Sequence, residues 1–272
     1  MKTLTAFDRS ALIRFASTLP EGSPERKAIL AGLVSSKSAS EEFNVPGKHV
    51  FGEAEVSGNA KVSGNAKVSG NALISGNALV FDEAEVHDEA VVYGYAQVYE
   101  RARLFGHVKV YGNAKVLGTC RLTRAVKVYG NAKVYGGVSL EDSVKVYGNA
   151  FVYGTGWLAD RAQVYDDAVV YGNVKVYHDA RVYGKADVFG DVQLYDSAQV
   201  YGDARVSGNA KVHGGARVLG NAKVFGSAEV AIDAVVYGDA RIGGTAMILG
   251  GEWDGSEGEI LSGRWRAPNV PA

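Results

Sequence analysis

The chain has 272 residues, and its 29 lysine and arginine side chains nearly balance 30 aspartate and glutamate side chains, which leaves a formal net charge of -1. A charge this close to zero excludes a general electrostatic attraction to nucleic acid or to an anionic membrane. The single cysteine, Cys120, excludes an internal disulfide framework, and no stretch approaches the roughly 18 apolar residues that a transmembrane helix needs.

Residues 1–35 predict two short helices, and residues 36–49 a polar linker. The first ten residues contain no apolar run, so we expect no secretory signal peptide. One helix would begin near Asp8, and the second would follow Ser23-Pro24, a capping residue with proline at the first helical position. The apolar residues that share a stripe on these helices are Leu12, Phe15, Leu19, Ile29 and Leu33.

Two interpretations of this N-terminal segment stay open. The helices could cap the first coil of the domain that follows, because an uncovered sheet edge invites aggregation. They could instead dock the protein onto a protein partner, which the length and polarity of the linker favour. They resemble short helical leader segments of phage and bacterial proteins, which implies incorporation into a larger assembly.

From Val50 to Ile248 an aliphatic residue recurs at every sixth position, without insertion or deletion, so 34 such residues bound 33 hexads. The fifth position of each hexad is small, and the third and fourth positions are rich in glycine, asparagine and aspartate. Side chains alternate between the two faces of a strand, so the first and fifth positions would share the interior. Glycine and asparagine tolerate the positive φ of a sharp corner. Each hexad therefore predicts one short strand and one corner.

A longer period sets the number of hexads in one coil. In every third hexad, counted from the one that begins at Val50, the third position departs from glycine in 7 of 11 cases. The two other classes of hexads keep glycine in 10 and 9 of 11 cases. A period of three hexads predicts three hexads per coil, hence a three-sided parallel β-helix of 11 coils over residues 50–248. Residues 249–272 would form a C-terminal cap.

The uninterrupted V-x-G-N-A-x pattern resembles the hexapeptide-repeat family of left-handed parallel β-helix proteins. The resemblance covers residues 50 to about 250 and is strongest to the long, loop-free members that are often described as acetyltransferases. It implies an all-β fold, a left-handed coil and a homotrimer. Enzymes of this family use acetyl-CoA and a histidine base near a cleft between subunits, often beside a loop that leaves a coil. Here no loop interrupts the frame, which favours a scaffold over an enzyme.

If the chain were a CoA-dependent acyltransferase, His178 would be the first candidate for the general base. It occupies a third position, and its counterparts one coil away are Asp160 and Asp196. Two carboxylates beside an imidazole could orient it and favour its charged form. The competing interpretation is that aspartate and histidine merely serve as corner residues. The spacing of the histidines matches no zinc site, so no metal is expected.

The outer surface carries a column of tyrosines, one per coil. Eight of the 15 tyrosines occupy the second position of one class of hexads, and several have a lysine or arginine two residues before them. Such a column is either a flat contact surface for a second copy or a polymer such as a glycan, or a β-surface stabilised by cross-strand pairing. The residues are Tyr93, Tyr111, Tyr129, Tyr147, Tyr165, Tyr183, Tyr201 and Tyr237, with Lys109, Lys127 and Lys145 beside them.

The sequence thus favours a non-catalytic structural or binding scaffold. We expect a rigid homotrimeric rod, free in the cytoplasm or incorporated in a particle assembled there, such as a phage particle. Its partner would be a protein held through residues 1–35, without nucleic acid, membrane or cofactor. The alternative is the acyltransferase, for which acetyl-CoA would be the cofactor.

Overall fold

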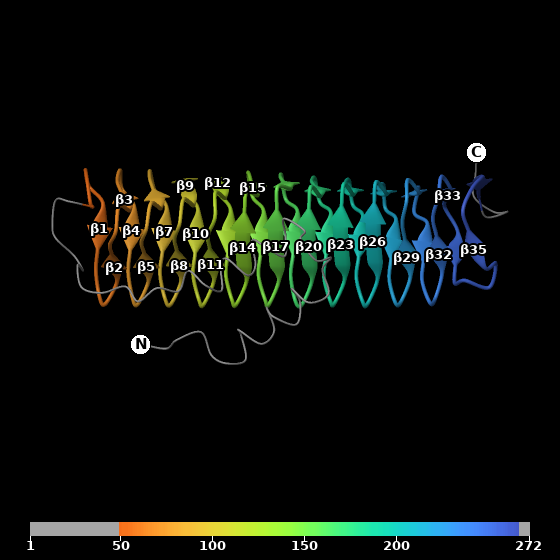
Figure 1. Ribbon diagram of the computed structural model, residues 1–272, viewed down its shortest axis with the longest axis horizontal. Helices are drawn as coiled ribbons and strands as arrows, with labels where there is room; N and C mark the ends of the chain where they lie inside the picture. Colours follow the sequence, from red (N-terminus) through yellow and green to blue (C-terminus); the bar gives the residue numbers. More distant parts are fainter. Residues whose placement is uncertain (1–48, 267–272) are drawn as a thin grey trace, which may run out of the picture. The chain divides into compact units, whose positions relative to one another are not determined.

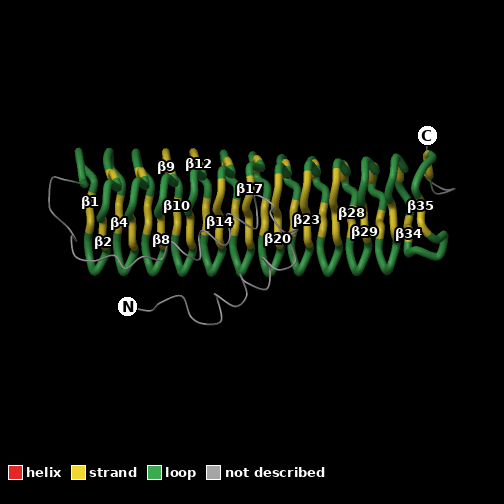
Figure 2. The backbone as a smooth tube through the Cα atoms, viewed as in Figure 1, coloured by secondary structure: helices red, strands yellow, loops and turns green. Residues whose placement is uncertain are grey.

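The computed structural model describes residues 49–266, and its regular structure there consists of 36 short β-strands. Each strand pairs in parallel with the strand that comes three strands later in the chain, which produces three sheets of 12 strands each. Figure 1 shows the coils following one another along a single axis, and Figure 2 shows that each coil alternates short strands with corners. The prediction of an all-β, three-sided parallel solenoid is confirmed.

The first sheet, called the β1 sheet below, places one strand of every coil on one side of the solenoid. Through most of the chain its partners are equivalent residues of successive coils, as in Lys109↔Lys127. The strands are β1 (Glu55–Val56), β4 (Leu73–Ile74), β7 (Val91–Val92), β10 (Lys109–Val110), β13 (Lys127–Val128), β16 (Lys145–Val146), β19 (Gln163–Val164), β22 (Arg181–Val182), β25 (Gln199–Val200), β28 (Arg217–Val218), β31 (Val235–Val236) and β34 (Glu252–Trp253).

The β2 sheet follows in each coil and contains five consecutive four-residue strands. Its members are β2 (Lys61–Val62), β5 (Leu79–Val80), β8 (Gln97–Val98), β11 (Lys115–Val116), β14 (Lys133–Gly136), β17 (Phe151–Gly154), β20 (Val169–Gly172), β23 (Asp187–Gly190), β26 (Arg205–Gly208), β29 (Lys223–Val224), β32 (Arg241–Ile242) and β35 (Glu259–Ile260).

The β3 sheet completes each coil. Its members are β3 (Lys67–Val68), β6 (Glu85–Val86), β9 (Arg103–Gly106), β12 (Arg121–Arg124), β15 (Ser139–Leu140), β18 (Trp157–Leu158), β21 (Lys175–Val176), β24 (Gln193–Leu194), β27 (Lys211–Val212), β30 (Glu229–Ala231), β33 (Met247–Leu249) and β36 (Arg264–Trp265).

One continuous apolar core runs through the solenoid. From Val62 to Ile248 the first-position residues are at most 1% exposed, and the small fifth-position residues share the same cluster. Close packing of this kind leaves no room for a ligand inside. Any functional site of the solenoid therefore lies on its outer surface, as the sequence predicts.

The corners owe their shape to the third position of each hexad, where φ is positive whether or not the residue is glycine. The following backbone N–H donates to the carbonyl of the third residue one coil on, as from Asn113 to Gly130 at 2.7 Å. Side chains at the fourth position extend this ladder, because the amide of Asn113 donates to Asn131 at 3.0 Å and that of Asn131 donates to Asn149 at 2.9 Å. The repeat therefore continues its hydrogen bonding through the corners.

The C-terminal residues add a coil that the hexad frame does not predict. β34, β35 and β36 pair with β31, β32 and β33, so each sheet has one strand more than the 11 coils expected. The pairings of β34 and β36 join residues that are one position closer in sequence than elsewhere, as in Val236↔Trp253. Trp253 is 7% exposed and meets Trp265 edge to face at 5.9 Å. Residues 249–266 thus form a final coil in which Trp253 joins the apolar core, while Trp265 stays 40% exposed.

Some expectations fall outside this description. The predicted helices with Leu12, Phe15, Leu19, Ile29 and Leu33 lie outside the described residues, as does all but the last residue of the linker. The left hand of the coil stays a prediction from the family resemblance. Within residues 49–266 there is no helix whose length and apolar character would let it cross a membrane.

Ile232, which occupies a third position at a corner, is expected to destabilise the fold. It is 45% exposed with a φ of 52°, a conformation that crowds a β-branched side chain. Replacement with asparagine, which tolerates this region, is expected to raise the free energy of unfolding by about 1 kcal/mol. Chemical denaturation followed by circular dichroism measures this gain. Ile232→Val keeps the branched Cβ, and an equal gain in that variant would contradict the backbone explanation.

Candidate functional site

The tyrosine column of the β1 sheet is a continuous stack of aromatic rings. From Tyr93 to Tyr201 each ring lies 4.7–4.9 Å from the next between centroids, and neighbouring planes are within 7° of parallel. Leu219 separates Tyr237 from this stack. The structure therefore brings seven of the eight predicted tyrosines into one ladder, which we call the tyrosine ladder.

This stacking decides which part of each ring is available. The faces of interior rings contact neighbouring rings, so edges and hydroxyl groups form the outer surface of the ladder. The edge of an aromatic ring carries partial positive charge and its face partial negative charge. The ladder therefore presents an electropositive rim with hydroxyl groups, rather than open ring faces on which a planar ligand could stack.

Partial burial in the ladder raises the pKa of the phenols above the ordinary value for tyrosine. The pKa reaches about 12 for Tyr165, where desolvation is the main cause and the neighbouring Tyr147 and Tyr183 add to it. Burial likewise raises the pKa of Tyr111, Tyr129 and Tyr147. The hydroxyl groups are therefore protonated at neutral pH and can donate hydrogen bonds.

A column of cations and glutamines lies beside the ladder, two residues before each tyrosine from Tyr111 to Tyr201. Lys109, Lys127 and Lys145 are in register on β10, β13 and β16. Glutamine then alternates with arginine in the same column: Gln163, Arg181, Gln199 and Arg217. We call the five charged members the cation column. Side chains at residues i and i+2 of a strand point to the same side, so the cations and tyrosines share one face.

The glutamines of the column hold the ladder in place. The hydroxyl of Tyr147 donates to Oε1 of Gln163 at 3.5 Å, and that of Tyr183 donates to Oε1 of Gln199 at 3.1 Å. Neutral glutamines also separate the arginine charges by two coils, which lowers the repulsion between them. The β1 face therefore combines hydroxyl groups that are held by hydrogen bonds with a row of positive charge that is denser at the three lysines than at the two arginines.

No acidic residue occupies the outward positions of the β1 sheet from β7 to β28. Among the described residues, the cation column forms no ion pair or cation–π contact. The other faces differ, because acidic side chains lie among their cations and pair with some of the arginines: Arg103 with Glu85 at 3.2 Å, Arg205 with Asp187 at 3.3 Å, and Arg241 with Glu259 at 2.7 Å. Between β7 and β28 the β1 face therefore carries cations and no acid at its outward positions.

Acids do lie along the neighbouring edge, but other groups engage them. Asp142 pairs with Arg124. Asp179 pairs with Arg161 at 2.5 Å, and the hydrogen bond from this guanidinium is the main reason that the pKa of Asp179 is lowered. The direct ion pairs of these two acids are thus made with arginines of the edge, while the charge of Arg181 also contributes to the lowered pKa of Asp179.

The structure also brings the three predicted catalytic residues together. Nδ1 of His178 lies 3.0 Å from Oδ1 of Asp196, and Oδ2 of Asp160 accepts the backbone N–H of His178 at 3.0 Å. The side chains of His178 and Asp196 are 52% and 45% exposed, so this corner is open to solvent. An exposed pair can orient an imidazole, but it supplies no water-excluded environment for acyl transfer.

A repeated backbone contact explains aspartate at the third position on all three edges of the solenoid. Five aspartates with positive φ each accept the backbone N–H of the third-position residue one coil on, at 2.8–3.3 Å. They are Asp82, Asp88, Asp160, Asp166 and Asp196. The contact gives a hydrogen-bond acceptor to the backbone N–H of the third residue, which the hydrogen bonds between strands do not engage. Aspartate therefore has a structural role at a corner even where no histidine is nearby.

The other histidines of the repeats also have carboxylate neighbours. His107 lies 2.9 Å from Glu89, His213 lies 3.1 Å from Glu229, and His87 lies 3.8 Å from Glu85 and 2.5 Å from the hydroxyl of Ser69. Pairing with an acid therefore does not distinguish His178. Within residues 49–266 no three histidine, cysteine, aspartate or glutamate side chains gather in a manner suited to a metal ion.

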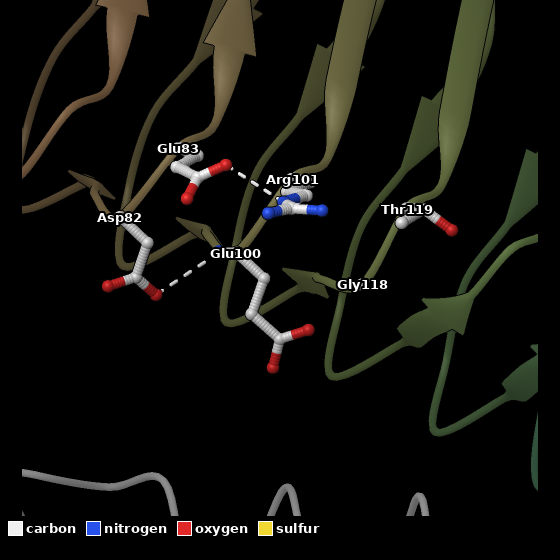
Figure 3. Close-up of a pocket in the computed structure, with 6 residues that line it drawn as sticks. All are labelled: Asp82, Glu83, Glu100, Arg101, Gly118 and Thr119. Atoms are coloured by element: carbon white, nitrogen blue, oxygen red, sulfur yellow. Dashed lines mark hydrogen bonds and ion pairs between the residues drawn. The ribbon is translucent and has the colours of Figure 1, made fainter.

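A shallow groove of about 430 Å³, which the sequence reasoning missed, lies on the edge after the β2 sheet. Figure 3 shows the residues that line it: Asp82, Glu83, Glu100, Arg101, Gly118 and Thr119. Arg101 pairs with Glu83 at 2.8 Å, and Asp82 accepts the backbone N–H of Glu100 at 3.2 Å. Burial raises the pKa of Glu100, while the backbone N–H of Gly118 opposes this shift. The only sequence signal was the loss of glycine at two successive third positions.

Comparison with known proteins supports the repeat and leaves the function open. A family model described as the YdcK β-solenoid repeat matches residues 162–178 and 198–214, two segments that begin two coils apart. Both segments end at the third position of a hexad that follows a strand of the β3 sheet: His178 after β21 and Gly214 after β27. No curated protein matches the chain. Together with the three parallel sheets, the matched repeat shows that the chain is a β-solenoid repeat protein.

Proposed function

We propose that the chain is a non-catalytic binding scaffold, a rigid β-solenoid whose flat outer faces hold a partner. The observation that carries this proposal is the β1 face, where the tyrosine ladder runs beside the column of cations and glutamines over six coils, from Lys109 to Tyr201. A filled interior and an uninterrupted frame fit a scaffold, because neither forms a substrate cavity. An aromatic stripe of this length also exceeds the scattered exposure of an ordinary surface.

The assembly that we propose is a homotrimer, which rests on the resemblance to the hexapeptide-repeat family. A protein partner at residues 1–35 would attach the solenoid to a larger assembly, such as a particle formed in the cytoplasm. Light scattering of the purified protein measures its mass and so tests directly whether it is a trimer.

The second candidate is a CoA-dependent acyltransferase of the hexapeptide-repeat family. It is favoured by one contact, that of His178 with Asp196 at 3.0 Å, which would orient the imidazole as a general base. The solvent exposure of this pair and the structural contact of each neighbouring aspartate count against it.

Acetyl-CoA is expected not to bind the purified protein saturably in isothermal titration calorimetry, with the oligomer confirmed by light scattering. Saturable binding or acyl transfer that is lost in His178→Ala would overturn the scaffold proposal. His107→Ala is the matched control, because His107 is also exposed and has a carboxylate neighbour at 2.9 Å. Binding that both variants retain would locate the ligand away from His178 and would still contradict a non-catalytic scaffold that needs no cofactor.

A further inference from the structure

We propose that the β1 face between β7 and β28 binds a linear acidic polysaccharide along the axis of the solenoid. This inference rests on the scaffold function and names its ligand. It comes from three features of the face: its uncompensated charge, its regular spacing and the orientation of its tyrosine rings.

The charge of the face calls for an anionic ligand. Three lysines in register are neighbours at the spacing of one coil, and like charges opposite one another destabilise a sheet. Among the described residues no carboxylate pairs with them. A polyanion laid along the column would relieve this repulsion and would release its own counter-ions, so its binding would weaken as salt rises.

The spacing of the face fits an extended chain. Coils follow one another at roughly 4.8 Å, so the six steps from Lys109 to Arg217 span about 29 Å in a straight line. A straight row of charges suits a polymer whose acidic groups recur along an extended backbone. Gln163 and Gln199 leave neutral amides on either side of Arg181, where their NH2 groups can donate hydrogen bonds to sugar hydroxyl groups.

The tyrosine rings favour a polysaccharide over a nucleic acid. Proteins that bind single strands use open aromatic faces as platforms for bases. Here the faces of the interior rings are occupied by neighbouring rings at 4.7–4.9 Å. What remains is a row of ring edges and protonated hydroxyl groups, which can hydrogen-bond to carboxylates and sugar oxygens.

The same charges disfavour a second copy of this chain as the occupant. Two copies of the face packed against each other would bring two cation columns together, and like charges across an interface are repulsive. A homotrimer would therefore use other faces and leave the β1 face uncovered.

The test measures binding of fluorescently labelled oligogalacturonates of defined length to the full-length protein by fluorescence anisotropy. Affinity is expected to rise with oligomer length until the chain spans about 29 Å, and then to level off. The triple variant Lys109→Gln, Lys127→Gln, Lys145→Gln is expected to weaken binding of the longest oligomer by about tenfold and to reduce its salt dependence.

The matched control is the triple variant Lys67→Gln, Lys175→Gln, Lys211→Gln. These lysines are exposed on the β3 sheet, so the control loses the same charge from another face. Its affinity is expected to stay close to that of the unchanged protein. Circular dichroism and light scattering confirm that both variants keep the fold and the oligomeric state.

Four results would overturn the inference: no binding to the unchanged protein, equal losses in the two triple variants, equal affinity for neutral cello-oligosaccharides, or tighter binding of oligothymidylate at the same ionic strength. Each of them leaves the scaffold function in place. The scaffold function fails instead if acetyl-CoA binds saturably, so the two failures are distinguishable.

Discussion

Replacing Gly154 with alanine is expected to lower the free energy of unfolding by about 3 kcal/mol. Gly154 has a φ of +105°, and an added Cβ would clash with the carbonyl oxygen of Gly172 and lie 2.7 Å from its nitrogen. Both are backbone atoms of the next coil, to which Gly154 is held by the pairing of β17 with β20. The corner can therefore relieve the clash only by giving up part of this pairing.

Gly214→Ala separates crowding from backbone strain. Gly214 has a φ of +66°, but an added Cβ would lie 3.3 Å from its nearest neighbour, the nitrogen of Ile232. The control is expected to lose only about 1 kcal/mol, the cost of a left-handed conformation with a Cβ. Guanidinium denaturation followed by circular dichroism compares the two variants. Equal losses would show that contact between coils does not limit the residues allowed at the corners.

Truncating Leu122 to alanine is expected to cost about 3 kcal/mol, because it removes buried methyl groups and leaves a cavity. Leu122 is fully buried and stands in register between Leu104 on β9 and Leu140 on β15. Every coil contacts only its neighbours in a solenoid, so no distant segment can move in to fill the space.

Leu122→Val is the conservative partner of this variant, because valine is the commonest residue at the first position. It is expected to cost about 1 kcal/mol. The same denaturation experiment measures both. A loss below about 1 kcal/mol for the alanine variant would mean that neighbouring coils collapse around the site, contrary to the close packing inferred for the core.

Most of the fold could be predicted from local rules that repeat. The first position of each hexad is buried, the third has positive φ, and the period of three hexads corresponds to one strand per sheet per coil. Repetition makes such a prediction strong, because every coil meets the same neighbours and a single rule is tested many times.

The last coil could not be predicted in this way. Its strands β34 and β36 follow their partners at an interval one position shorter than that of the repeat, and tryptophan takes the place of the aliphatic residue at Trp253 and Trp265. Both features leave the hexad frame. Their role depends on the tertiary structure, in which Trp253 joins the end of the core and meets the half-exposed Trp265 edge to face.

For the candidate surface, too, one part could be predicted from the sequence and another part could not. The column of tyrosines and the lysines beside it follow from the alternation of side chains in a strand and could be found by spacing alone. The sequence could not show whether the ring faces or the ring edges are exposed, or that Asp160 and Asp196 accept backbone N–H groups of the next coil.

By itself, the sequence determined that the chain forms a three-sided parallel β-solenoid, which residues point inward and which form columns outside. The reason is that strand alternation and corner conformation act within a single hexad. Only the tertiary structure decided how those columns are used. The stacked tyrosines hide their faces, the cations of the β1 face form none of the ion pairs that some arginines of the other faces make, and corner acids accept backbone N–H groups of the next coil. These features depend on contacts between residues about one coil apart in the sequence, where side-chain orientation is set by the neighbouring coil.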